Sequence, residues 1–85
     1  MRLTVRLGEP FWRLVQAKEV SVELPPGATV EDLLAGLARQ YPDLKEALEG
    51  DELPPTVFLG EQIADSGAAL AEGARPTLVW AMAGG

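Results

Sequence analysis

Two short runs in which every second residue is apolar come before the main helix signal, and this order restricts the folds open to the chain. Residues 2–7 and 19–24 alternate polar and apolar side chains, as strands with one buried face do. Between them, Gly8 interrupts the alternation and residues 11–15 form a short apolar connection. The two runs therefore predict an antiparallel pair of strands joined by a wide loop.

An amphipathic helix is predicted to follow the second run at once. Thr29 is a favourable N-cap residue, and Asp32 stands three positions later as a weaker capping-box partner. The apolar residues that follow fall on one helical stripe: Val30, Leu33, Leu34, Leu37, Ala38 and Tyr41. One face of this helix should therefore cover the sheet, with Leu33, Leu34 and Leu37 in contact with it.

The remainder of the chain predicts a second helical turn and three more strands. Pro42 disfavours helical geometry at Tyr41, so the main helix should end there, and Asp43 is expected to cap a short turn over residues 44–48. Three short β segments are expected after a loop, at residues 56–59, 62–64 and 77–82. The order ββαβββ predicts an α+β domain with one mixed sheet of four to five strands and one main helix packed on a face.

The chain contains neither histidine nor cysteine, and this absence excludes most kinds of active site. Its 85 residues allow one small domain. No thiol nucleophile, histidine base, Cys/His zinc site or disulfide framework can be built from them. No glycine-rich phosphate loop is followed by lysine, and the acidic residues lack the spacing of a calcium loop. We therefore expect no metal site and no bound cofactor.

The charge of the chain is acidic and unevenly distributed. The formal net charge is −6, and residues 43–72 carry eight acidic side chains with Lys45 as the base. This sign argues against nucleic acid and anionic membranes as partners. Either a basic protein partner meets this stretch, or its acids form a solvated surface. No targeting or membrane-spanning segment is visible, so the cytoplasm is the expected location.

The sequence ends on Gly84 and Gly85, and this pair is the strongest functional candidate. Glycine lacks Cβ, so such a tail can extend into a narrow channel of another protein. The α-carboxylate of Gly85 would then be the functional group, activated as an acyl-adenylate and passed to a nucleophile. A frayed terminus, or one left by an expression vector, is the alternative explanation.

Three further segments occur in the order typical of one family. They are Gly-Ala-Thr-Val-Glu-Asp-Leu-Leu at 27–34, Tyr-Pro-Asp-Leu at 41–44, and Leu-Ala-Glu-Gly at 70–73, with Gly85 twelve residues later. With these segments the chain resembles the ubiquitin-like sulfur carriers (MoaD/ThiS-like), and among them the small subunit of molybdopterin synthase. The resemblance implies a β-grasp, or ubiquitin-like, fold over residues 1–82 and a flexible diglycine tail at 83–85.

The resemblance also implies a function that resides in the tail. Gly85 would be adenylated and thiocarboxylated, with Gly84 providing clearance, so that the chain donates sulfur in molybdenum cofactor biosynthesis. The implied partners are a ubiquitin-activating-type adenylyltransferase that uses ATP and magnesium, a sulfur donor enzyme, and the molybdopterin synthase large subunit in a heterotetramer. The chain would be a carrier subunit without an autonomous active site.

Two segments depart from the family pattern and leave the pathway open. Ala-Arg-Pro at 74–76 replaces the usual acidic pair and apolar residue, and Trp-Ala at 80–81 replaces the usual Pro-Pro. The sulfur could instead serve thiamine, cysteine or tRNA thiolation, or the tail could modify lysines as a ubiquitin-like protein. From another class, the alternative is a β-grasp interaction module with no carboxylate chemistry.

Partner-binding candidates lie close to the tail and on the hairpin before it. Trp80 and Met82 share one face of the expected final strand, where they could form an apolar docking patch or pack in the core. Phe58 and Leu59 fall on opposite strand faces, so one of them should be core and the other exposed. Residues 11–12, Phe-Trp, are expected to close the core.

Overall fold

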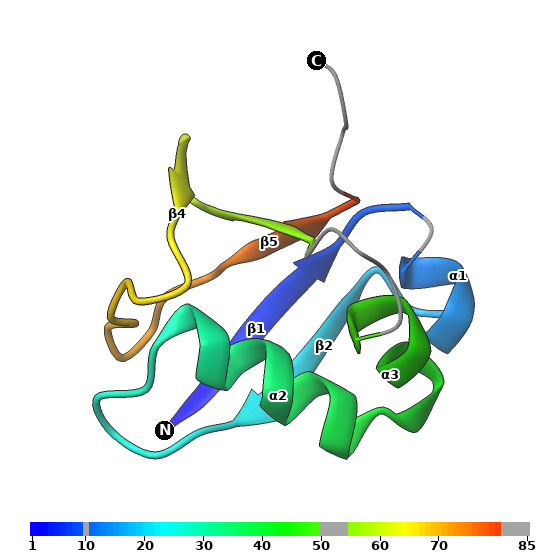
Figure 1. Ribbon diagram of the computed structural model, residues 1–85, viewed down its shortest axis with the longest axis horizontal. Helices are drawn as coiled ribbons and strands as arrows, with labels where there is room; N and C mark the ends of the chain where they lie inside the picture. Colours follow the sequence, from blue (N-terminus) through cyan, green and yellow to red (C-terminus); the bar gives the residue numbers. More distant parts are fainter. Residues whose placement is uncertain (10, 50–54, 81–85) are drawn as a thin grey trace.

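Eight elements make up the part of the chain that the computed structural model describes, residues 1–9, 11–49 and 55–80. In chain order they are β1 (Arg2–Leu7), α1 (Phe11–Val15), β2 (Glu19–Glu23), α2 (Val30–Gln40), α3 (Pro42–Glu49), β3 (Thr56–Leu59), β4 (Gln62–Ala64) and β5 (Thr77–Val79). The strands form one five-stranded sheet in the order β2-β1-β5-β3-β4 (Figure 1). β1 pairs with β2 in antiparallel and with β5 in parallel orientation. The predicted mixed sheet and its first antiparallel pair are thus confirmed.

The start of α2 has the predicted capping box. The backbone N–H of Thr29 donates to Asp32 Oδ2 at 2.9 Å, and the backbone N–H of Asp32 donates to Thr29 Oγ1 at 3.4 Å. Two further N–H groups of the first turn donate to the segment between β4 and β5. The Val30 N–H donates to the carbonyl of Ala68, and the Glu31 N–H donates to that of Ser66. These bonds satisfy donors that a helix leaves free at its N-terminus, and they hold the start of α2 against the segment between β4 and β5.

Two helical predictions are wrong in detail. Residues 11–15, predicted only as a short apolar connection, form the short helix α1. A helical turn lets the Trp12 N–H bond to the Gly8 carbonyl at 3.2 Å while the Phe11 side chain is fully buried. In addition, α3 begins at Pro42, so Asp43 lies in its first turn and does not cap it. Proline suits the first helical position because its fixed φ is helical and its missing N–H would have no partner there.

The core lies between the sheet and α2, with α3 closing one end. Leu33 and Leu37 are fully buried, whereas Leu34 is only half-buried at the border of the core. All three contact the core as predicted, but not to the same depth. Gly36 is also buried, and a Cβ built there would lie 2.9 Å from Leu24 Cδ2. Glycine at this position therefore lets α2 lie close to the end of β2.

Candidate functional site

The candidate site is the end of β5 together with Trp80, from which the C-terminal tail continues. We call residues 78–80 the root of the tail. Of the predicted site residues, Gly84, Gly85 and Met82 lie outside the described residues, and Trp80 is the last residue described. β5 is flanked by β1 and β3 on its two sides. The segment that leads to the tail therefore starts from the middle of the sheet and not from an edge (Figure 1).

Close backbone packing holds the root in place. The Gly8 N–H donates to the Leu78 carbonyl oxygen at 2.7 Å, directly beyond the Leu7–Leu78 register pair. A Cβ at Gly8 would lie 3.2 Å from that same oxygen and 3.2 Å from Val79 Cγ1. The chain directly after β1 is therefore in tight contact with Leu78 and Val79, the last two residues of β5.

From the sequence, Trp80 could either pack in the core or form a docking patch, and the structure has features of both. Its ring centroid lies 5.8 Å from that of Phe11, with the planes tilted by 40°. Phe11 is fully buried, but Trp80 is 40% exposed. One part of the indole thus packs on the core, and the other part is available to a partner.

We expect Trp80→Ala to destabilise the fold measurably. An aromatic pair contributes about 0.5–1.5 kcal/mol beyond its buried area, and alanine removes both contributions. Trp80→Phe keeps a ring beside Phe11 and is the matched control. Urea titration of both variants measures the effect, and equal stability of Trp80→Ala and wild type would contradict the proposed ring contact.

Two basic side chains gather around Trp12, Arg13 from α1 and Lys18 from the segment that follows it. Arg13 lies over the Trp12 ring at 4.9 Å from the centroid, and Lys18 approaches the same ring at 5.5 Å. Arg13 also pairs with Glu9 at 2.8 Å, and this hydrogen bond and charge hold the pKa of the Glu9 carboxyl below its usual value. Cation–π contacts and the ion pair orient the exposed cations around Trp12.

The open face of the sheet carries the remaining candidate, Phe58. The residue of β3 that is buried in the core is Val57, and Leu59 packs beside it while remaining half-buried. Phe58 points to the opposite face and is also half-buried, so the expected contrast between core and exposed residue is weaker than predicted. Its cross-strand neighbour Ile63 is 68% exposed. Sequence analysis missed Ile63, although the two-residue turn between β3 and β4 would have placed it opposite Phe58.

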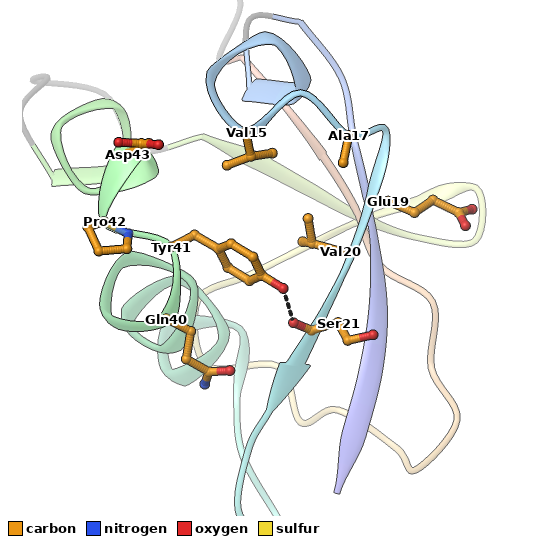
Figure 2. A pocket seen from close by; sticks show the side chains of 9 residues that line it. All are labelled: Val15, Ala17, Glu19, Val20, Ser21, Gln40, Tyr41, Pro42 and Asp43. Atoms are coloured by element: carbon orange, nitrogen blue, oxygen red, sulfur yellow. Dashed lines mark hydrogen bonds between the residues drawn. The ribbon is translucent and has the colours of Figure 1, made fainter.

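A shallow groove lies on the other side of the molecule, between β2 and the junction of α2 and α3 (Figure 2). Its volume is about 490 Å³, and its central contact is the Tyr41 hydroxyl, which donates to the Ser21 carbonyl oxygen at 2.7 Å. The residues that line it are Val15, Ala17, Glu19, Val20, Ser21, Gln40, Tyr41, Pro42 and Asp43. The groove does not adjoin the root of the tail.

The described residues contain neither a cluster of metal-ligating side chains nor a helix that could span a membrane. In residues 1–9, 11–49 and 55–80, no group of three or more acidic side chains is arranged to hold a metal ion. No helix in that part of the chain is long and apolar enough to cross a membrane.

The chain is similar to known proteins in its three-dimensional structure. No protein-family model and no curated protein sequence matches the chain. The crystal structure of SAMP1 from Haloferax volcanii matches it with a TM-score of 0.83 and 25% identity over 100% of both chains. The putative molybdopterin converting factor subunit 1 from Pyrococcus furiosus matches with a TM-score of 0.77 and 21% identity, over 96% of this chain and 99% of that one.

Mycobacterium tuberculosis CysO is a third similar structure, with a TM-score of 0.72 and 19% identity over 94% of this chain and 99% of CysO. These matches span whole chains and not a shared fragment, and the sheet order with parallel β1 and β5 is the β-grasp arrangement expected from the sequence. The chain is therefore a β-grasp protein, and the solved structures that it is similar to are ubiquitin-like sulfur carriers of the MoaD/ThiS type, the type that its sequence segments resemble.

Proposed function

We propose that this chain is a sulfur carrier whose Gly85 carboxylate is adenylated and then converted to a thiocarboxylate. The observation that carries the proposal is a strand, β5, fixed in the centre of a sulfur-carrier fold and followed in sequence by a diglycine. Residues 81–85 lead from Trp80 to the Gly85 carboxylate, so an extended tail could reach at most about 18 Å from the root. A partner must therefore bring its reactive centre that close to the end of β5.

The proposed chemistry uses the chain as a co-substrate. A carboxylate oxygen of Gly85 attacks the α-phosphorus of ATP in the adenylyltransferase, and pyrophosphate leaves. A sulfide equivalent from the sulfur donor enzyme then attacks the acyl carbon, and AMP leaves with the oxygen that formed the ester bond. ATP and magnesium are bound by the activating enzyme, while this chain supplies the carboxylate and the docking surface around Trp80 and Phe58.

The pathway that we propose is molybdenum cofactor biosynthesis, with the chain as the small subunit of molybdopterin synthase. Support comes from the sequence segments at 27–34, 41–44 and 70–73 and from the likeness to the Pyrococcus furiosus protein. Within the complex, the thiocarboxylate would transfer its sulfur to a pterin precursor held by the large subunit.

A second candidate function is supported by the full-length likeness to SAMP1, a small archaeal modifier protein. In that case a lysine amine of a target protein would attack the acyl carbon of the Gly85 adenylate, an isopeptide bond would form, and AMP would leave. Both functions require the same adenylation step, and they differ in the nucleophile that follows it.

Pyrophosphate release tests the step that the two functions share. The chain is incubated with ATP, magnesium and a ubiquitin-activating-type adenylyltransferase, and a chain truncated before Gly84 is the control. We expect release with the full chain only. Addition of a molybdopterin synthase large subunit or of lysine-containing target proteins then separates sulfur transfer from conjugation. Equal release with both chains would refute tail activation.

Association with a basic partner should slow steeply as the salt concentration rises. The acidic stretch at 43–72 exposes side chains such as Glu46 and Glu72, and their field accelerates encounter with a partner of opposite charge. Dissociation should change little. Glu46→Gln with Glu72→Gln should reproduce part of the effect, whereas Glu31→Gln, outside the stretch, should not. Stopped-flow rates that are independent of salt would contradict this steering.

A further inference from the structure

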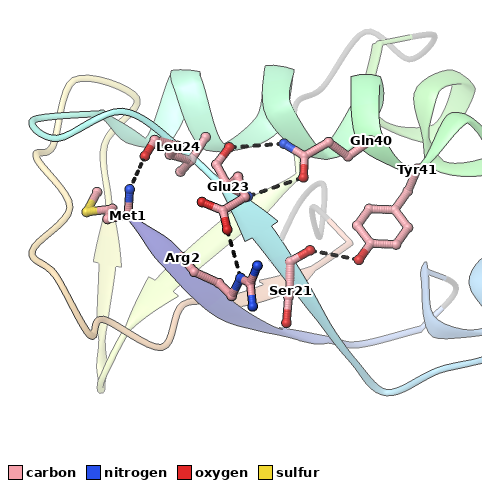
Figure 3. Close-up of polar contacts among 7 residues, drawn as sticks. All are labelled: Met1, Arg2, Ser21, Glu23, Leu24, Gln40 and Tyr41. Carbon is pink, nitrogen blue, oxygen red and sulfur yellow. Dashed lines mark hydrogen bonds and ion pairs between the residues drawn. The ribbon is translucent and has the colours of Figure 1, made fainter.

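The two edge strands of the sheet, β2 and β4, differ in how far other residues bond to their outward-facing backbone. At the β2 edge, side chains from the end of α2 cover the outward-facing backbone (Figure 3). The Glu23 N–H donates to Gln40 Oε1 at 3.2 Å, and Gln40 Nε2 donates to the Glu23 carbonyl oxygen at 3.0 Å. The Gln40 amide thus bonds as a neighbouring strand would. Together with the Tyr41 hydroxyl on the Ser21 carbonyl, it closes much of this edge to further pairing.

The opposite edge, β4, has no such cover among the described residues. A two-residue turn makes Leu59 and Gln62 a hydrogen-bonded pair, so the next pair, Phe58 and Ile63, is a non-hydrogen-bonded one. Consequently the N–H and C=O of Ile63 point away from β3. Outside the strand ladders, the backbone and side-chain hydrogen bonds of the described residues do not reach these two groups.

The surface beside this backbone is apolar on the open face and acidic at both ends. The Ile63 side chain is 68% exposed and lies opposite the half-buried Phe58. Glu61 precedes β4 and Asp65 follows it, and both are exposed. Within the part of the chain that the structure describes, the two ion pairs involve neither carboxylate. An occupant of this edge should therefore bring an apolar residue flanked by positive charges.

We propose that β4 is the docking edge for an extended segment of a partner protein, which pairs with the Ile63 backbone and places Lys or Arg side chains beside Glu61 and Asp65. Backbone bonds would supply affinity, and the flanking charges would select basic segments. This goes beyond the carrier proposal, because it involves neither the tail nor its activation and holds whichever nucleophile follows. β4 is separated from β5 by β3, so a partner could use this edge while the tail is engaged elsewhere.

A synthetic peptide, Lys-Val-Lys-Val-Lys with both ends blocked, tests the proposal on the full chain by NMR. We expect saturable changes in the amide signals of residues 61–65 and slower hydrogen exchange at Ile63. The matched peptide Glu-Val-Glu-Val-Glu should produce neither. Changes centred on residues 19–23, equal binding of the two peptides, or no saturable change up to the solubility limit would overturn the proposal.

Two variants separate backbone pairing from charge. Ile63→Pro removes the outward N–H, a change that an edge position tolerates, whereas Ile63→Val keeps it. We expect the proline variant to bind the lysine peptide about tenfold more weakly, as the loss of a backbone hydrogen bond implies, and the valine variant to bind it nearly as wild type does.

The charge variant keeps the test decisive if Ile63→Pro does not fold. Glu61→Lys with Asp65→Lys should reverse the preference of the chain, so that the glutamate peptide binds and the lysine peptide does not. Unchanged preference in this double variant would contradict the proposed role of the two carboxylates. Peptide binding measured by NMR requires neither the adenylyltransferase nor ATP, and pyrophosphate release is measured on the unchanged chain, so failure of this proposal is distinguishable from failure of the carrier function.

Discussion

Replacing Gly85 by alanine is expected to reduce activation by the adenylyltransferase by about 100-fold or more, since small displacements of a reacting group have effects of that size. The carboxylate must approach the α-phosphorus of ATP in line inside a site that excludes water. A methyl group at the last position would widen the tail beside the reacting atoms. The free energy of unfolding should hardly change, because a chain terminus contributes little to folding.

A matched substitution elsewhere distinguishes this effect from a general cost of losing a glycine. A Cβ at Gly67 would meet no atom within 4 Å, and Gly67 lies in the segment between β4 and β5, far along the chain from the tail. Gly67→Ala should therefore be activated at the wild-type rate. Adding one residue after Gly85 should block activation, because it displaces the carboxylate by up to about 3.6 Å. Wild-type rates for Gly85→Ala or for the extended chain would contradict the proposed role of the tail.

Replacing Leu33 by alanine should have the largest effect on stability, with a loss of about 2–5 kcal/mol. Leu33 is fully buried between α2 and the sheet, so its removal loses apolar contacts and leaves a cavity. Leu34, the next residue, is half-buried and is the matched control. We expect Leu34→Ala to cost less than half as much, because the site is open to water and can relax.

Denaturant titration of the two leucine variants measures this difference. Equal losses would contradict the burial of Leu33 and the half-exposure of Leu34, because both leucines would then contribute equally to the core. Because neither residue is near the root of the tail, activation of the folded fraction should remain unchanged in both variants.

The main elements of the fold could be predicted from the sequence because they rest on local patterns. Alternation over residues 2–7 and 19–24 determines β1 and β2, and the Thr29–Asp32 pair determines the start of α2. These signals involve neighbours along the chain, and hydrophobic periodicity makes them visible. The resemblance at the family level likewise depended on short segments in a fixed order.

Other features depended on contacts between distant parts of the chain. The helical turn at Phe11–Val15 forms because Phe11 is buried against residues far along the sequence, and no periodicity shows in five residues. Ile63 is exposed because β4 is an edge strand, which follows from the sheet order and not from its own three residues. Glycine has low helix propensity, and its presence at position 36 inside α2 is explained by the closeness of the Leu24 side chain, which leaves no room for a Cβ.

The position of Trp80 is a feature that the sequence left undecided for a physical reason. A tryptophan just before the end of a chain can pack on the core or form a contact surface, and its ring is large enough for both. The structure shows that it does both, with one side beside Phe11 and 40% of its surface exposed.

The intact mass of the chain after enzymatic sulfuration tests the carrier function most directly. The wild-type chain is incubated with ATP, magnesium, a ubiquitin-activating-type adenylyltransferase and a sulfur donor enzyme, and then measured by mass spectrometry. We predict a gain of about 16 Da, because a thiocarboxylate replaces one oxygen by sulfur in the acyl exchange, and no gain for Gly85→Ala. A wild-type mass that stays unchanged, or a gain of the same size and rate in Gly85→Ala, would contradict the carrier function and favour an interaction module without carboxylate chemistry.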